Sequence, residues 1–156
     1  MENIISTYLE RDDEIAANIV ELFKPKQVSA EPRPWGRSSS MAVVKKIERR
    51  AMNDVSVSST DVSARYVKMF EWVGVTFEVA ESDATVLAEA NRVRNILLHR
   101  YGEIETSDVA GFPSLAEWEG KVMPMTQARF TRYFNSIKAF LMALSDGIYE
   151  KWPPTS

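Results

Sequence analysis

Apolar residues recur every three or four positions along most of this chain, which is the spacing that places side chains on one face of an α-helix. The clearest run covers residues 126–149 and predicts one long helix with an apolar stripe. The apolar positions of this stripe are Phe130, Tyr133, Phe134, Ile137, Phe140, Leu141, Leu144 and Ile148. The same spacing predicts further helices over about residues 4–23, 41–52, 61–72 and 83–101.

Proline, glycine and serine separate the predicted helices. Pro25 would end the first helix because proline cannot continue the helical hydrogen-bond ladder. Residues 25–40 contain three prolines and three consecutive serines, so a loop is expected there. A second loop is predicted over residues 53–60. Residues 103–124 are predicted to be irregular, with one short helical turn at 114–118.

The fold class follows from this pattern. Residues 73–77 are β-prone, but one short run among helical patterns does not predict a sheet, and Gly74 favours a helix end. Gly102 and the pair Pro153-Pro154 would end the last two helices. The expected fold is therefore all-α, an irregular bundle of about five helices that forms a single domain over residues 1–156.

The composition narrows the class of protein. A chain of 156 residues with 45% apolar residues can bury one hydrophobic core. It has no cysteine, which excludes disulfides, thiolate zinc sites and cysteine nucleophiles. The net charge of −3 disfavours nucleic-acid binding through bulk charge and leaves a local basic groove open. Without a basic and apolar leader or an apolar run of about 20 residues, a soluble cytoplasmic protein with no membrane contact is expected.

Candidate chemistry is concentrated in residues 94–101, with the sequence RNILLHRY, which contain the only histidine of the chain. A helix turns about 100° per residue, so Asn95 and His99 share a flank that lies roughly 100° to 140° around from Arg94. Arg94 and Tyr101 are expected within the apolar face of the helix. Arg94 and His99 would therefore meet only at a kinked helix end, or across a second copy of the motif.

These residues fit two interpretations. An imidazole, a guanidinium and an amide are enough to bind a phosphodiester and transfer protons at it without a metal. Histidine titrates nearest to neutral pH, and arginine binds phosphate through paired N–H groups. In the other interpretation the residues have only a structural role: the methylene groups of Arg94 pack over apolar surface, and His99 interacts only with the helix dipole. Spacing alone leaves both interpretations open.

The pattern Arg94-Asn95-x-x-x-His99 resembles the R-x4-6-H motif of the HEPN superfamily, the helical "higher eukaryotes and prokaryotes nucleotide-binding" domains. Residues 89–102, with the sequence EANRVRNILLHRYG, are similar to the motif helix of such proteins, which often carry asparagine after the arginine. Arg94, His99 and Tyr101 also match the R-x4-H-x-Y form of one subset. The resemblance extends over about residues 82–103, and elsewhere it is only architectural.

This resemblance implies a metal-independent endoribonuclease without a cofactor, acting as a toxin or an antiviral-defence effector. The RNA would supply its own ribose 2′-hydroxyl as the nucleophile, so cleavage would leave a 2′,3′-cyclic phosphate and spare DNA. His99 would be the acid or base, Arg94 would hold the phosphate, and Asn95 would orient His99 or bind a phosphate oxygen. Such proteins usually form homodimers in which two motifs face one cleft.

Two further expectations depend on the resemblance. In R-x4-H-x-Y relatives, a partner nucleotidyltransferase antitoxin can modify the tyrosine with adenylate, so Tyr101 is either a regulatory modification site or an ordinary core aromatic. An acidic chain that cuts RNA also needs local positive charge. The candidates for RNA binding are Lys45, Lys46, Arg49, Arg50, Arg92 and Arg100, and the alternative for the first four is a solvated helix face.

Two other functions stay open at this point. One is a non-catalytic HEPN-like module that binds nucleotide, RNA or a protein partner, and the other is an unrelated helical interaction domain. A single histidine does not make a multi-histidine zinc site, so no metal is expected. The chain has neither a G-x-S-x-G nucleophile elbow nor a G-x-x-x-x-G-K-[ST] phosphate loop. Glu103, Glu105 and Asp108 are expected in a solvated loop.

Overall fold

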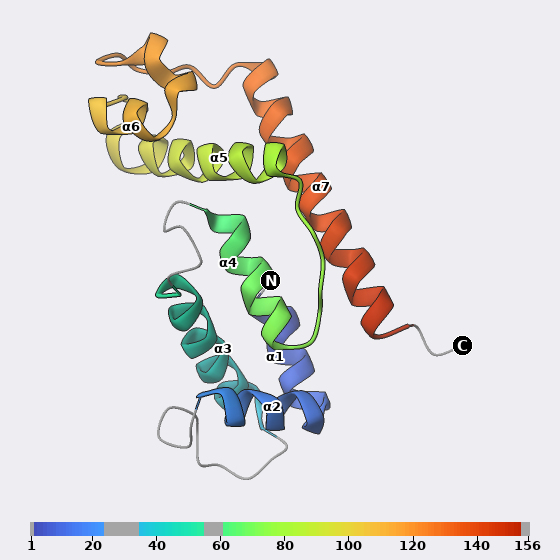
Figure 1. Cartoon of the computed structure of the whole chain (residues 1–156). Helices are drawn as coiled ribbons and strands as arrows, with labels where there is room; N and C mark the ends of the chain where they lie inside the picture. The colour runs from blue at the N-terminus through green and yellow to red at the C-terminus, as the bar shows by residue number, and fades with distance from the viewer. Residues whose placement is uncertain (1, 24–34, 55–60, 154–156) are drawn as a thin grey trace. The chain divides into compact units, whose positions relative to one another are not determined.

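The computed structural model describes residues 2–23, 35–54 and 61–153 (Figure 1). Within these ranges the chain forms seven α-helices and one 3-10 helix, with no strand. The elements are α1 (Glu2–Arg11), α2 (Asp13–Phe23), α3 (Arg37–Met52), α4 (Val62–Trp72), α5 (Glu81–Arg100), α6 (Thr106–Gly111), the 3-10 helix η1 (Pro113–Trp118) and α7 (Gln127–Lys151). The predicted all-α class is confirmed, and the HEPN-like arrangement of the bundle stays a prediction.

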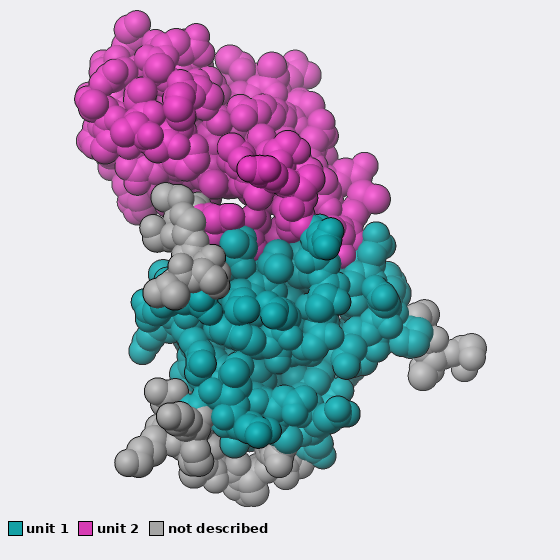
Figure 2. Space-filling model, viewed as in Figure 1, with its two compact units in different colours: residues 1–59, 64–78, 144–156 teal, residues 60–63, 79–143 magenta. Residues whose placement is uncertain are grey.

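The chain divides into two compact units (Figure 2). Unit 1 contains residues 1–59, 64–78 and 144–156, and unit 2 contains residues 60–63 and 79–143. Helix α5, which carries the motif, belongs to unit 2, whereas α7 begins in unit 2 and ends in unit 1. A single domain over the whole chain stays a prediction from chain length.

In unit 1, α1 packs against α2 and α3. A buried polar cluster joins α1 to α3, in which the hydroxyls of Ser6 and Ser40 lie 2.8 Å apart and within 3.0 and 2.8 Å of Glu10 Oε1. These hydroxyl groups lower the pKa of the Glu10 carboxyl. Ile5 and Ile47, both fully buried, belong to the surrounding apolar core.

The first predicted helix is in fact two helices. Asp12 interrupts the helix predicted over residues 4–23 and separates α1 from α2. Its Oδ1 atom accepts hydrogen bonds from the backbone N–H groups of Glu14 and Ile15, both at 3.0 Å. A short carboxylate in this position satisfies the N–H groups at the start of a helix. The apolar spacing continues across the break, so it could not reveal the break.

Helix α3 begins at Arg37, ahead of the start predicted at Met41. The serines before Met41 were expected in a loop, but Ser40 is buried in the polar cluster, where its hydroxyl finds partners inside a helix. Trp35, just before this helix, is also buried. Most of the loop predicted before this helix lies outside the described residues, as does most of the loop predicted over 53–60.

In unit 2, residues 103–124 are more regular than the sequence predicted. They contain α6 and η1, and Glu103 forms an isolated antiparallel bridge with Val122. The start of α6 is stabilised by Glu105 and Asp108, each of which binds the backbone of the other. The side chains of this segment complete a core whose buried members are Val93, Ile96, Ile104, Leu115, Met123 and Tyr133.

Helix α7 has two apolar faces, and only one of them is buried. The stripe predicted for this helix divides into buried Tyr133, Phe140 and Leu144, half-buried Ile148, and exposed Phe130, Phe134, Ile137 and Leu141. The two sets lie side by side around the helix, because a turn of about 100° per residue separates them by less than a right angle on average. Hydrophobic spacing does not determine how far around a helix the protein's own contacts extend.

Candidate functional site

The motif lies at the C-terminal end of α5, where the chain turns sharply. Tyr101 follows the last helical residue in the left-handed conformation, with φ 53° and ψ 25°, and Gly102 has a φ of 93°. The N–H groups of Tyr101 and Gly102 both donate to the Ile96 carbonyl, the second at 3.2 Å, which satisfies an acceptor at the end of the helix. This cap places His99 in the last turn of the helix.

The buried face of α5 differs from the face that spacing predicted. The buried residues of the helix are Ala88, Glu89, Val93 and Ile96. Arg94 and Tyr101 were expected within the apolar face, but both are exposed, as is Leu98. That expectation is therefore wrong. The buried face of α5 is centred on other residues: it includes the Glu89 carboxylate and leaves Leu98 exposed to solvent.

Three motif side chains lie on the accessible side of α5. The Arg94 Nη1 atom donates to Asn95 Oδ1 at 3.3 Å, and Asn95 is half-buried. His99 is exposed one turn after Asn95, and the described residues include no hydrogen-bond or ion-pair partner for its side chain. The amide of Asn95 therefore connects the Arg94 guanidinium to the flank of the helix that carries His99.

Arg92 and Arg100 on the same helix are paired with a buried carboxylate. Asp108, which is 1% exposed, accepts hydrogen bonds from Arg92 Nε at 2.5 Å, Arg100 Nη2 at 2.6 Å and the Glu105 N–H at 2.9 Å. Burial raises the pKa of Asp108, but the Glu105 N–H and the two guanidinium groups outweigh burial and hold that pKa below its usual value. The expectation that Asp108 lies in a solvated loop is wrong.

These ion pairs bear on the predicted RNA-binding residues. Arg100 also pairs with Glu105 at 2.6 Å, so acidic groups offset its charge, whereas the Arg92 side chain keeps 41% of its surface exposed. Both arginines hold the start of α6 against the last turns of α5. A role for either in RNA binding stays a prediction.

The remaining predicted RNA-binding residues belong to α3 in unit 1, and all are exposed: Lys45, Lys46, Arg49 and Arg50. Arg50 donates to the Leu22 carbonyl at 2.9 Å and lies over the Phe23 ring at 4.9 Å, so it helps to fix the end of α2. His99 belongs to unit 2. A cleft shared by these cations and His99 stays a prediction.

Tyr101 is 89% exposed. The interpretation of this residue as a core aromatic is therefore wrong, because its ring leaves the core at the left-handed cap. An exposed phenol is accessible to a second enzyme. Modification by an antitoxin stays a prediction.

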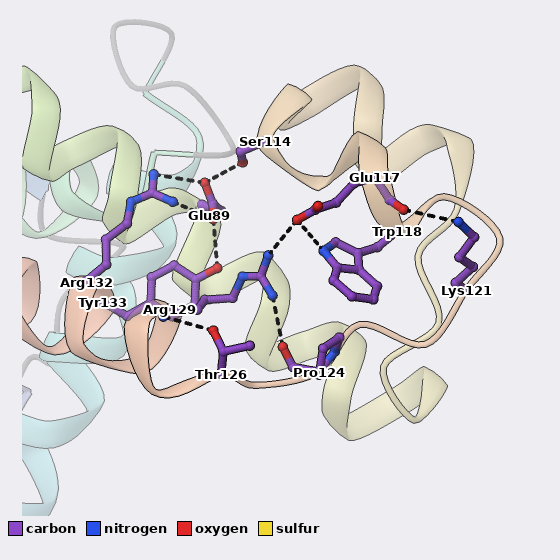
Figure 3. Close-up of polar contacts among 10 residues, drawn as sticks. All are labelled: Glu89, Ser114, Glu117, Trp118, Lys121, Pro124, Thr126, Arg129, Arg132 and Tyr133. Carbon is purple, nitrogen blue, oxygen red and sulfur yellow. Dashed lines mark hydrogen bonds and ion pairs between the residues drawn. The ribbon is translucent and has the colours of Figure 1, made fainter.

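A buried carboxylate that the sequence analysis did not single out joins α5 to α7 (Figure 3). Glu89 accepts hydrogen bonds from Arg132 Nη1 and Nη2 at 3.1 and 3.2 Å, from the Tyr133 hydroxyl at 2.7 Å and from Ser114 Oγ at 2.7 Å. Burial raises the pKa of Glu89, but these donors outweigh it and the pKa falls below its usual value. Burial and the adjacent Glu89 raise the pKa of Tyr133. The sequence signal that could have revealed Glu89 is its place between apolar positions on one face of a predicted helix.

Within the described part of the chain, no three histidine, cysteine or acidic side chains gather to form a potential metal site. None of the described helices combines the length and the apolar character needed to cross a membrane. Comparisons with models of protein families, with curated proteins and with solved structures found no match. The residues of α5 and the motif they form are therefore the basis for a functional proposal.

Proposed function

We propose that this protein is a metal-independent endoribonuclease of the HEPN type that acts in the cytoplasm as a toxin or an antiviral-defence effector. The observation that carries the proposal is the joint exposure of Arg94 and His99 on α5, with Asn95 hydrogen-bonded to Arg94 at 3.3 Å. A phosphodiester can reach these groups, and an imidazole that has no partner among the described residues is available for proton transfer.

The reaction needs two proton transfers and stabilisation of charge on the phosphate. One group removes the proton of the ribose 2′-hydroxyl, whose oxygen attacks the adjacent phosphorus, and another protonates the 5′-oxygen that leaves. His99 would perform one transfer, and Arg94 would bind the phosphate oxygens as their charge increases. The products would be a 2′,3′-cyclic phosphate and a 5′-hydroxyl, and no metal is consumed or required.

A second copy of the chain would complete the site. Arg94 and His99 lie about 140° apart around the helix, so one ideal helix does not direct both at the same atom. In a homodimer with two motifs facing one cleft, Arg94 of one copy would meet His99 of the other. The second proton transfer would then fall to the second His99.

Regulation by a nucleotidyltransferase antitoxin is part of the proposal. The exposed phenol of Tyr101, two residues after His99, would accept an adenylate group that places a charged phosphate beside the motif. The exposed cations of α3 would supply most of the positive charge that the acidic chain otherwise lacks. Arg92 would add to it through the exposed part of its side chain, whereas Asp108 and Glu105 offset the charge of Arg100.

The test is cleavage of a labelled RNA by the purified full chain in EDTA. We expect His99→Ala and Arg94→Ala to lose activity, with the helical circular dichroism spectrum unchanged because both side chains are exposed. Asn91→Ala, an exposed polar position on the same helix, is the matched control and should cleave like the wild type. Equal cleavage by wild type and His99→Ala, or none by a folded wild type, would refute the proposal.

The second candidate function is a non-catalytic module that binds nucleotide, RNA or a protein partner. The observation that favours it is the angle between Arg94 and His99, which a single copy does not overcome. Such a module would bind RNA and leave it intact, and Arg94→Ala would raise the dissociation constant. Detection of 2′,3′-cyclic phosphate ends among the products distinguishes the two functions.

A further inference from the structure

The exposed apolar face of α7 is a large surface that the proposed site does not use. Its members, Phe130, Phe134, Ile137 and Leu141, are 59%, 54%, 43% and 50% exposed. We call these four residues the α7 seam. The rings of Phe130 and Phe134 stack at 6.2 Å within the seam. The members of the seam have the alternating spacing of three and four residues found in heptad patterns, which is typical of helices that pair with other helices.

The spacing of the α7 seam is symmetric. Its members are separated by four, three and four residues, so the pattern is the same from either end of the helix. If two α7 helices pair antiparallel about a two-fold axis, Phe130 of each copy faces Leu141 of the other, and Phe134 faces Ile137. Each layer then combines an aromatic with an aliphatic side chain, and both halves of the interface are identical, as a two-fold dimer requires.

The charges of α7 favour another copy of this chain over a lipid surface or an acidic partner. From Gln127 to Ser145 the charged residues are Arg129, Arg132 and Lys138. Arg129 donates to the Pro124 carbonyl at 2.9 Å, and Arg132 pairs with Glu89. Lys138 alone lacks a partner among the described residues, whereas a helix that binds anionic lipid is rich in lysine and arginine.

The polar border of the seam also suits self-association. Gln127, Thr131, Asn135 and Lys138 are exposed on the side of the seam away from the buried face. Three of these four side chains are uncharged, so two copies brought together would meet little charge repulsion. An apolar centre with a polar rim is the usual composition of a protein–protein interface.

The exposed area is adequate for the centre of an interface. An aromatic side chain contributes roughly 150–250 Å² and an aliphatic one less, so two of each that are about half exposed present roughly 300–400 Å² in each copy. Two copies would bury about twice that area, which is roughly half of a standard stable interface. The polar border and the adjacent turns of α7 would contribute the remainder.

We infer that the α7 seam is a homodimer interface, in which two copies of α7 pack antiparallel with Phe134 of each against Ile137 of the other. The argument uses no property of Arg94 or His99. The composite site of the proposed function also needs a homodimer, so a monomeric wild type would contradict both proposals. A dimer that does not cleave RNA would contradict only the ribonuclease proposal, and a dimer that persists in both glutamate variants of the seam would contradict only this inference.

The first test measures the mass of the full chain by sedimentation equilibrium. We expect a dimer at micromolar chain concentration and a monomer for Phe134→Glu and for Ile137→Glu, with the helical circular dichroism spectrum unchanged. The matched control is Ala139→Glu, because Ala139 is exposed on the same helix and lies on the side opposite the seam at about 100° per residue. This control should remain dimeric.

The second test uses the absence of cysteine from the chain to place the contact. Under oxidation, a mixture of Phe134→Cys and Ile137→Cys chains should form mixed disulfide dimers faster than either variant alone. A mixture of Phe130→Cys with Ile137→Cys should not, because these positions are in different layers. Faster cross-linking of each variant with itself would indicate parallel pairing and overturn the register.

Three results would overturn the inference. A monomeric wild type at all accessible concentrations would exclude a homodimer. A dimer that persists in both glutamate variants would place the interface on another surface. A monomer that binds anionic vesicles through Phe134 would assign the seam to a lipid surface.

Discussion

The buried carboxylate of Asp108 connects the last turns of α5 to the start of α6, so its replacement tests how the motif end of the helix is held. Asp108→Asn removes the negative charge and keeps the size of the side chain and one acceptor oxygen. Arg92 Nε, at 2.5 Å in the wild type, would lose its ionic partner. Arg100, whose Nη2 atom lies at 2.6 Å, would lose one of two and keep Glu105. The amide oxygen would still accept the Glu105 N–H.

The size of the effect follows from burial. Breaking a buried ion pair by removing one partner costs about 3–5 kcal/mol. The side chains of Arg92 and Arg100 keep 41% and 23% of their surface exposed, so water compensates part of the loss. We expect the free energy of unfolding to fall by about 2–3 kcal/mol, which corresponds to a lower urea midpoint by about 1 M or more.

The same residue predicts a pH dependence. The pKa of Asp108 is lower in the folded than in the unfolded chain, so its contribution to stability is present above its ordinary value of 3.8 and is lost as the pH falls through the folded-state pKa. The stability difference between wild type and Asp108→Asn should therefore be constant near neutral pH. It should shrink as the pH falls from about 5 to below 3.8.

Urea denaturation, followed by circular dichroism across this pH range, measures both effects. Glu103→Gln is the matched control, because Glu103 is an exposed carboxylate of the same segment, and its free energy of unfolding should stay within about 0.5 kcal/mol of wild type. Equal midpoints for Asp108→Asn and wild type, or a difference that does not change with pH, would refute the reasoning.

The remaining predictions concern two backbone positions. A Cβ atom at Gly147 in α7 would lie 2.5 Å from the Thr76 carbonyl oxygen. Gly147→Ala should therefore lower the free energy of unfolding by about 1–2 kcal/mol, despite the better helix propensity of alanine. Gly111→Ala is the control and should not lower it, because a Cβ atom there would meet nothing within 4 Å. A higher melting temperature for Gly147→Ala would contradict the close approach. Tyr101 has a φ of 53° and is 89% exposed, so Tyr101→Gly should raise stability by about 0.5–1 kcal/mol and Tyr101→Phe should not change it. A loss of stability in Tyr101→Gly would mean that the ring packs on the protein.

The helices were predictable to the extent that their signals are local. The apolar spacing and the glycines placed α4, α5 and α7 to within about two residues at each end. The break at Asp12 and the short helix α6 were missed, because each depends on a carboxylate binding nearby N–H groups. The apolar pattern carries no information about such bonds.

The candidate site was predictable as a set of residues but not as a surface. The motif and the single histidine drew attention to Arg94, Asn95 and His99, and all three lie on one accessible helix end. Their orientation was wrongly expected, because α5 buries Glu89 among apolar residues and exposes Leu98. Residues from α7 and η1, far away in sequence, make that burial favourable by donating hydrogen bonds to Glu89.

The sequence by itself determined that this chain is helical and where most helices begin and end, because helix periodicity and caps act between residues a few positions apart. Only the tertiary structure decided which helix faces are buried. Burial depends on partners brought together from distant segments, such as Asp108 beside Arg92 and Arg132 beside Glu89. For the same reason, the pattern along α7 could not show that half of its apolar stripe would remain exposed.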